Sequence, residues 1–115
     1  MSGLHASPVE GLNIYWNDAL TDISGLSGLT SVGGSLSIYE NDALANLDGL
    51  SGVTSVGLDL YFHNNDALTD ISGLSNLTFV GGDLYIRDNP ALCQSLVDAF
   101  VAACTCSVGD ISGNL

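Results

Sequence analysis

Basic side chains are nearly absent from this chain. Arg87 is its single basic residue and no lysine occurs, whereas 13 acidic residues give a formal net charge of -12 at pH 7. A surface this negative repels nucleic-acid phosphates and anionic lipid headgroups. The composition therefore predicts no nucleic-acid partner and no attachment to an anionic membrane surface.

Long apolar runs are absent as well. No stretch approaches the roughly 18 apolar residues that span a bilayer, so membrane insertion is not expected. Residues 1–10 lack the basic and apolar segments of a signal peptide. Hydrophobic residues nevertheless make up 46% of the 115 residues, which suits a single globular domain with a buried core.

The chain repeats itself every 24 residues. The tetrad Asn-Asp-Ala-Leu begins at Asn17, Asn41 and Asn65, and a variant with proline in its second position begins at Asn89. Repeats of this length are typical of solenoids, in which each coil contacts only its neighbours. Apolar side chains keep the same period in three further columns: Leu12, Leu36, Leu60 and Leu84; Ile14, Ile38, Phe62 and Ile86; Val32, Val56 and Val80.

Each repeat combines a short strand pattern with an irregular coil. Apolar and polar residues alternate in Leu36–Tyr39, as in a strand with one buried face. Later apolar residues recur every three positions through Gly49 and Gly52, and glycine disfavours an α-helix. We predict an all-β fold, a parallel β-solenoid whose strands stack about 4.8 Å apart. A second short strand is expected at Thr54–Val56, and the isoleucine column is expected to form a buried row.

Two further repeating features concern the backbone. We expect the asparagine that begins each tetrad to turn inward, to bond its copy in the next coil and to satisfy backbone amides at the bend. The pairs Gly33-Gly34 and Gly81-Gly82 precede a predicted strand. They are interpreted as tight corners with backbone angles that other residues avoid.

The C-terminal region breaks the repeat and is interpreted as a cap. Residues 94–103 place Leu96, Val97, Phe100 and Val101 at helical spacing without glycine or proline, which predicts a short capping α-helix over the last coil. The predicted organisation is a single domain, 1–115. It has a lead-in at 1–10, full coils at 11–34, 35–58 and 59–82, a partial fourth coil at 83–92, a helical cap at 93–106 and a final edge strand at 107–115.

The repeat carries a family resemblance. The pattern Leu-x-Ile-x-x-Asn-x-x-Leu, in residues 36–44 and 84–92, resembles the core of leucine-rich repeats. With its Gly-Gly pair and no helical segment, the repeat over residues 12–92 resembles the receptor L domain family, in a bacterial form with 24-residue repeats. The resemblance implies a right-handed, leucine-rich-repeat-like solenoid, display outside the cell or at its surface, and binding of a protein or other ligand. It implies no catalysis.

Aromatic and basic side chains are predicted on the outward side of the strands. Such side chains on a rigid face are the usual anchors of protein interfaces. The alternative is that β-propensity alone accounts for the tyrosines. The candidate binding face comprises Tyr15, Trp16, Tyr39, Tyr61, His63, Tyr85 and Arg87.

Three cysteines, Cys93, Cys104 and Cys106, lie in the predicted cap. A disulfide from Cys93 to Cys104 or Cys106 would pin the helix to the sheet. Buried free thiols and a metal site are the alternatives, and the spacing is poor for zinc because no histidine lies nearby. No cofactor is expected, and catalysis has no support because His5 and His63 are isolated in the sequence.

Two more columns suggest alternative functions. Acidic residues repeat at Asp18, Asp42 and Asp66, where a calcium ion is conceivable, but solvated turn acids are the favoured interpretation. The column Thr30, Thr54 and Thr78 has the flat threonine array of several ice-binding proteins. A short lead-in that contains Pro8 is expected to leave strand edges open, which suggests a structural protein that self-associates end to end.

Overall fold

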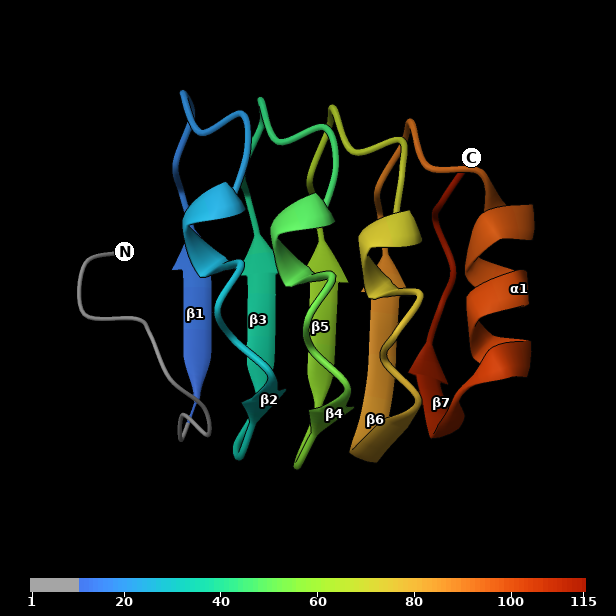
Figure 1. Cartoon of the computed structure of the whole chain (residues 1–115). Helices are drawn as coiled ribbons and strands as arrows, with labels where there is room; N and C mark the ends of the chain where they lie inside the picture. Colours follow the sequence, from blue (N-terminus) through green and yellow to red (C-terminus); the bar gives the residue numbers. More distant parts are fainter. Residues whose placement is uncertain (1–10) are drawn as a thin grey trace.

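The computed structural model of the chain describes residues 11–115, so the lead-in at 1–10, with Pro8 and His5, lies outside the described residues. The fold is mostly one parallel β-sheet with one α-helix, and successive stretches of chain wind past one another in stacked layers (Figure 1). The elements are β1 (Leu12–Tyr15), η1 (Ser24–Leu26), β2 (Ser31–Val32), β3 (Leu36–Tyr39), η2 (Asp48–Leu50), β4 (Ser55–Val56), β5 (Leu60–His63), η3 (Ser72–Leu74), β6 (Phe79–Arg87), α1 (Gln94–Ala103) and β7 (Thr105–Asp110), where η marks a 3₁₀ turn.

The sheet contains two rows of strands that share β6. Its order is β1-β3-β5-β6-β4-β2, with β7 paired to β6 outside this path, and every pairing is parallel. The first residues of β6 pair with β4 and its last residues pair with β5, so the two rows join. Ile14 pairs with Ile38, Ile38 with Phe62, and Phe62 with Ile86. The predicted row is confirmed, and each of these side chains is buried.

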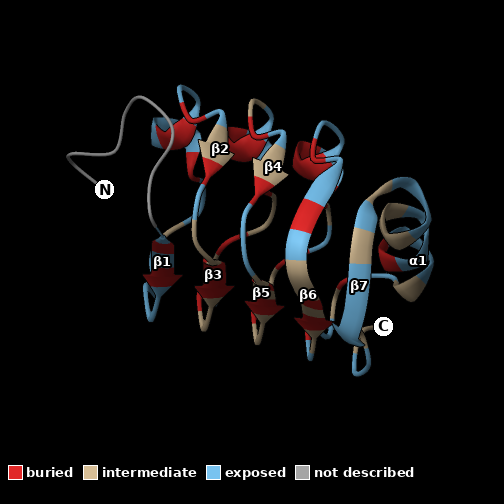
Figure 2. Cartoon of the chain, turned by 90° about the horizontal axis from the view of Figure 1, so that it is seen from below, coloured by how far each residue is buried: buried red, intermediate tan, exposed pale blue. Residues whose placement is uncertain are grey.

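The core is built from the repeated apolar columns. Figure 2 shows buried residues along the strands and at the 3₁₀ turns, with the turns on the opposite side of the windings from β1, β3 and β5. In the central winding the apolar side chains of Leu44, Leu47, Leu50 and Val53 are fully buried. Because each winding supplies the same positions, an interior layer of the core packs between two nearly identical layers.

The expectation that Gly33-Gly34 and Gly81-Gly82 adopt unusual backbone angles is wrong. Among residues 11–115, the one glycine with a positive φ is Gly113. Space is the reason for glycine at this corner: a Cβ on Gly57 would clash with the carbonyl of Gly33, and a Cβ on Gly81 would clash with the carbonyl of Gly57. Glycine therefore lets the windings approach to strand distance.

The unusual backbone angles lie at the residue that follows each of the strands β1, β3, β5 and β6. Trp16, Glu40, Asn64 and Asp88 have φ of 56°, 58°, 57° and 56°, in the left-handed region that L-residues rarely adopt. Their N–H groups continue the parallel ladder, as when Glu40 donates to the carbonyl of His63 at 3.2 Å. The left-handed residue ends each strand and turns the chain toward the asparagine that follows it.

The predicted asparagine ladder is confirmed. The Nδ2 atoms of Asn41 and Asn65 donate to the carbonyl oxygens of Ile14 and Ile38, both at 3.0 Å. The backbone N–H of Asn65 donates to Oδ1 of Asn89 at 3.2 Å, which links one winding to the next. In residues 11–115 every buried side-chain nitrogen or oxygen has a hydrogen-bond partner, so the ladder carries no desolvation penalty from an unpaired amide.

The C-terminal end closes the stack of windings. The predicted helix is confirmed as α1, and its Val97 is fully buried against the core. Strand β7 pairs with β6, and Asn114 then takes a fifth place in the ladder: its Nδ2 donates to the carbonyl of Ile86 at 2.7 Å, and its Oδ1 accepts the N–H of Asn89 at 3.2 Å. Within residues 11–115, no helix has the length and apolar character needed to cross a bilayer.

Candidate binding face

Strands β1, β3, β5 and β6 present alternate side chains on the outward side of the sheet. In the strand register, Tyr15 pairs with Tyr39, Tyr39 with His63, and His63 with Arg87. Side chains alternate between the two faces of a strand. Because the intervening residues such as Ile38 point into the core, the aromatic column points out.

The aromatic rings of this face stack on one another along the sheet. The ring centroids of Tyr15 and Tyr39 lie 5.1 Å apart with planes 6° from parallel, and those of Tyr39 and His63 lie 4.8 Å apart at 9°. A second stack joins Tyr61 and Tyr85, 4.7 Å apart at 8°. Parallel strands lie about 4.8 Å apart, which is also a favourable ring separation. The strand spacing therefore holds these rings side by side.

Carboxylates lie along one border of the face. The hydroxyl of Tyr61 donates to Asp59 at 3.0 Å, and the hydroxyl of Tyr85 donates to Asp83 at 3.5 Å. The hydrogen bond to Asp59 raises the pKa of Tyr61, whereas desolvation is the main cause of the raised pKa of Tyr85, followed by the charge of Asp83. Both phenols therefore stay protonated at neutral pH.

His63 is held neutral within its stack. Partial burial, followed by the charge of Arg87, lowers the pKa of His63, while Glu40 and Asp88 act weakly in the opposite direction. Nδ2 of Asn64 lies 3.1 Å from Nδ1 of His63, and an amide donor at that distance requires an unprotonated Nδ1. His63 is thus an uncharged ring between Tyr39 and Arg87.

The two ends of the face differ in chemistry. At one end, Trp16 is 72% exposed and meets Tyr15 edge-on, with ring centroids 5.8 Å apart. At the other end, the guanidinium of Arg87 lies 3.1 Å from the carboxylate of Asp88, and both side chains are substantially exposed. Exposed ion pairs contribute little stability, so the effect of this pair is to orient Arg87 at the end of the stack.

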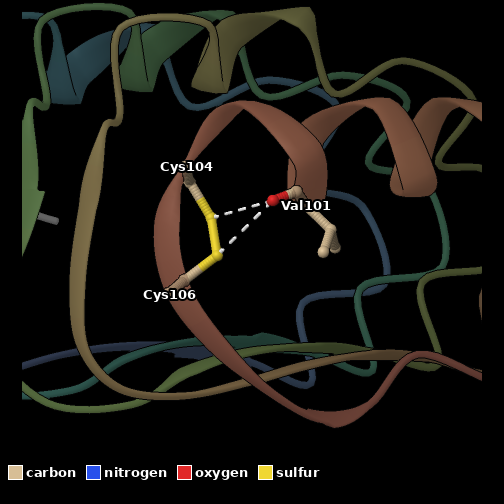
Figure 3. The surroundings of a disulfide bond; sticks show 3 residues. All are labelled: Val101, Cys104 and Cys106. Carbon is tan, nitrogen blue, oxygen red and sulfur yellow. Dashed lines mark hydrogen bonds between the residues drawn. A yellow bond between two sulfur atoms is a disulfide. The ribbon is translucent and has the colours of Figure 1, made fainter.

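The predicted pairing of Cys93 with Cys104 or Cys106 is wrong. The disulfide joins Cys104 to Cys106, and Cys93 is a free, exposed cysteine. Cys93 and Cys104 flank α1, whose ten residues extend about 15 Å, far beyond disulfide reach. Cys104 and Cys106 are two positions apart in extended chain and so point the same way. Both sulfurs lie near the Val101 carbonyl oxygen, at 3.8 and 3.9 Å (Figure 3).

One column of acidic residues forms hydrogen bonds in the turns, and the other is exposed. Asp22 and Asp70 accept the backbone N–H groups of Ser24 and Ser72 at 3.1 and 2.8 Å, at the start of η1 and η3. These hydrogen bonds lower the pKa of both carboxyls, mainly through the Ser24 hydroxyl for Asp22 and the Ser72 backbone for Asp70. Asp18, Asp42 and Asp66 are exposed. In the described part of the chain, no three His, Cys, Asp or Glu side chains converge as a metal site would require.

The threonine column follows the strand register. The N–H of Thr54 donates to the carbonyl of Thr30 at 2.9 Å, and the N–H of Thr78 donates to that of Thr54 at 3.1 Å. The hydroxyl of Thr54 also donates to the Thr30 carbonyl, at 3.3 Å. This hydroxyl is therefore directed back to the backbone rather than to solvent.

Comparison with known families assigns the chain. Residues 9–99, from the residues before β1 into α1, match the family model of the receptor L domain. The chain belongs to the receptor L domain family. No curated protein and no solved structure matches it. Receptor L domains are non-catalytic modules that bind ligands or proteins, and they are typically extracellular parts of receptors. The candidate functional site of this L domain is therefore a binding face rather than an active site.

Sequence reasoning placed the aromatic residues of this L domain but missed their neighbours. Asp59 and Asp83 precede Tyr61 and Tyr85 by two positions, and residues two apart on a strand share a face. This signal could have identified the acidic border. Asn64, the contact of His63, could not have been identified in this way because its left-handed backbone interrupts the alternation.

Proposed function

We propose that this L domain binds a protein partner, or another ligand, without catalysis, through the outward face of strands β1, β3, β5 and β6. The contact residues are Tyr15, Trp16, Tyr39, Tyr61, His63, Tyr85 and Arg87. In this proposal the windings form a right-handed, leucine-rich-repeat-like solenoid with the predicted coil boundaries, displayed outside the cell or at its surface.

The observation that supports this function best is the stacking of rings on the outward face, where Tyr15 is exposed and the other stacked rings are half-buried. Tyr15, Tyr39 and His63 form one continuous stack, and Tyr61 and Tyr85 form another. Rings fixed by their neighbours lose little conformational freedom when a partner binds, and that entropy loss is a large part of the cost of association. Aromatic side chains with few rotatable bonds are also the commonest interface anchors.

The charge of the face indicates the kind of partner. Asp59 and Asp83 lie beside the tyrosines, and the whole chain carries a formal charge of -12. Complementary potentials accelerate association and exclude partners of like charge. A partner with basic or neutral polar residues around an apolar centre is therefore expected.

A displayed peptide library, selected against the full chain, tests the proposal. Selected peptides should be rich in basic residues and should lose binding to the double variant Tyr39→Ser/Tyr61→Ser, while circular dichroism shows an unchanged fold. Phe79→Ser is the matched control, because Phe79 is an exposed aromatic residue in the other row of strands. Peptides that bind the double variant as tightly as the natural chain would reject this face.

Two alternatives are distinguished by simple measurements. End-to-end self-association uses the edge of β1, and it requires a particle mass that rises with protein concentration in light scattering. Ice binding uses Thr30, Thr54 and Thr78, and it requires thermal hysteresis. The Thr54 hydroxyl is bonded to the Thr30 backbone and Phe79 lies beside the column, so the threonine column is a weaker basis than the aromatic stacks.

A further inference from the structure

A groove of about 280 Å³ lies between the 3₁₀ turn η3 and helix α1. The 3₁₀ turns are on the opposite side of the windings from β1, β3 and β5 (Figure 2). The groove is therefore separate from the candidate binding face, and neither the family match nor the proposed function assigns it a role.

The groove exists because a helix follows a series of tighter turns. Turns η1, η2 and η3 stack closely, and a Cβ on Gly73 of η3 would clash with the carbonyl of Leu47 in the preceding winding. Packed α-helices need about 8–10 Å between axes, whereas strands need about 4.8 Å. Helix α1 cannot approach η3 as closely as another winding would, so a channel remains between them.

The walls of this channel are apolar. Leu74 and Leu77 form its floor from the third winding, where they are almost wholly buried, and α1 contributes Leu96, Ala99, Phe100 and Ala103. These helix positions are spaced i, i+3, i+4 and i+7, which defines one face of a helix. That face is separate from Val97, which packs into the core, and Leu96 remains 43% exposed. Ala99 and Ala103 are exposed as well, whereas Phe100 is half-buried against the core, so this second apolar face of the helix is only partly covered by residues 11–115.

The rim of the groove is polar and negative. Asp70, Ser72, Ser75 and Thr78 lie on the side of the third winding. The backbone N–H of Ser72 donates to Asp70 and lowers the pKa of that carboxyl, so Asp70 is ionised at neutral pH. The chain's single basic residue, Arg87, does not line the groove.

We propose that the groove between η3 and α1 binds a small cationic amphiphile, that is, an apolar chain with an amine head. The apolar chain lies against Leu74, Leu77, Leu96 and Phe100, and the ammonium group lies at Asp70 with hydroxyl acceptors from the rim. The groove of about 280 Å³ lies near the lower limit of small-molecule sites, roughly 300 Å³, which favours a short chain. An eight-carbon chain with one amine matches this size.

Three probes of equal chain length test the proposal on the full chain: octylammonium, octanol and octanoate, each below its aggregation concentration. Binding is followed by two-dimensional amide NMR, which locates the site and measures Kd together. Octylammonium should bind saturably, with shifts confined to η3 and α1, octanol should bind more weakly, and octanoate should not bind. Equal binding of octanoate would overturn the proposal.

Two matched pairs of variants separate this site from general charge attraction. Ala99→Trp fills the groove and should abolish binding, whereas Ala102→Trp changes an exposed alanine of the same helix outside the groove and should not. Asp70→Asn should weaken octylammonium about fivefold, the effect of one charge pair in a watery setting, and should leave octanol unchanged. Asp66→Asn removes an equal charge elsewhere and should have no effect.

Other outcomes contradict the proposal directly. Equal losses in Asp70→Asn and Asp66→Asn would mean that the amine is attracted only by the overall charge. Shifts in η3 and α1 that depend on protein concentration without any probe would assign the groove to a second copy of the chain. Because Tyr39→Ser/Tyr61→Ser leaves the groove intact, octylammonium binding in that variant should match the natural chain, so the proposal succeeds or fails independently of the aromatic face.

Discussion

Oδ1 of Asn65 accepts two hydrogen bonds from Asn41, one from its backbone N–H and one from its Nδ2, both at 3.3 Å. The two residues are 24 positions apart and are both fully buried. A single side-chain oxygen therefore satisfies two donors of the neighbouring winding. The ladder depends on such shared acceptors along its whole length.

Replacing Asn65 by alanine should lower the free energy of unfolding by about 3 kcal/mol, because buried groups of Asn41 and Ile38 lose their partners. Urea denaturation measures the change. Asn17→Ala is the control at the exposed end of the ladder, with an expected loss of about 1 kcal/mol. Equal losses of unfolding free energy in the two variants would show that the buried part of the ladder contributes no more to stability than its exposed end.

Alanine should have opposite effects at equivalent glycines of successive 3₁₀ turns. A Cβ on Gly49 would clash with the carbonyl of Ile23, so Gly49→Ala should cost about 3 kcal/mol of stability through overpacking. Among the described residues, a Cβ on Gly25, one winding earlier, meets nothing within 4 Å. Gly25→Ala should therefore raise stability by about 0.5 kcal/mol, because it restricts the unfolded chain. Thermal melts of the two variants should shift in opposite directions.

Glycine at position 40 should stabilise the fold. Glu40 has a φ of 58°, which costs an L-residue roughly 1–2 kcal/mol, and glycine removes this cost while adding about 0.4–1 kcal/mol of unfolded-state entropy. Glu40→Gly should gain about 0.5 kcal/mol on balance. Asp42→Gly also removes one negative charge, two residues later, but relieves no left-handed backbone strain, so it should lose stability. A loss in both variants would contradict the strain argument.

The neutral state of His63 predicts a pH dependence. Burial and Arg87 lower the pKa of His63 below 6.5 in the folded chain. The unfolded chain therefore binds more protons between the lowered pKa and 6.5, and stability is lost as the pH falls through this window. NMR titration of the His63 ring should show the lowered pKa, and Arg87→Gln should raise it. An unchanged pKa in Arg87→Gln would exclude the charge effect.

The disulfide should contribute little to stability. Cys104 and Cys106 are two positions apart, and closing so short a loop restricts the unfolded chain by about 1.6 kcal/mol at most. A bridge across α1 would contribute about 3 kcal/mol. The double variant Cys104→Ser/Cys106→Ser should therefore lose less than about 2 kcal/mol. Peptide mapping under non-reducing conditions should recover Cys93 unpaired, and recovery of a peptide linked through Cys93 would contradict the structure.

The features that follow from the period alone were predictable from the sequence. The pairing of Ile38 with Phe62 required only that equivalent positions stack, and the asparagine ladder required only that buried amides find partners. The features that depend on three-dimensional spacing were not predictable. The left-handed angle at Trp16 has no signal in its residue type. The sequence predicts the helix beside η3, but the groove between them depends on how closely the helix can approach the turn, which the sequence does not specify.

In the binding face and in the C-terminal cap, the positions of side chains along the chain were predictable, but the partners that they contact were not. Tyr61 and Tyr85 were identified from their shared column, whereas the hydrogen bonds to Asp59 and Asp83 depend on side-chain reach. The pairing of Cys104 with Cys106 depends on the extended chain that leaves α1, which the helical pattern of residues 94–103 does not specify.

Each winding adds one rung to the outward face at a constant spacing. Duplicating residues 35–58, which carry Tyr39 and Asn41, should lengthen that face by one ring while the duplicated ladder asparagine meets the same partners as before. Deleting the same segment should shorten it by one ring. The area available to a partner therefore changes in steps of one winding. Duplication or deletion of a 24-residue segment adjusts it without the redesign of any contact.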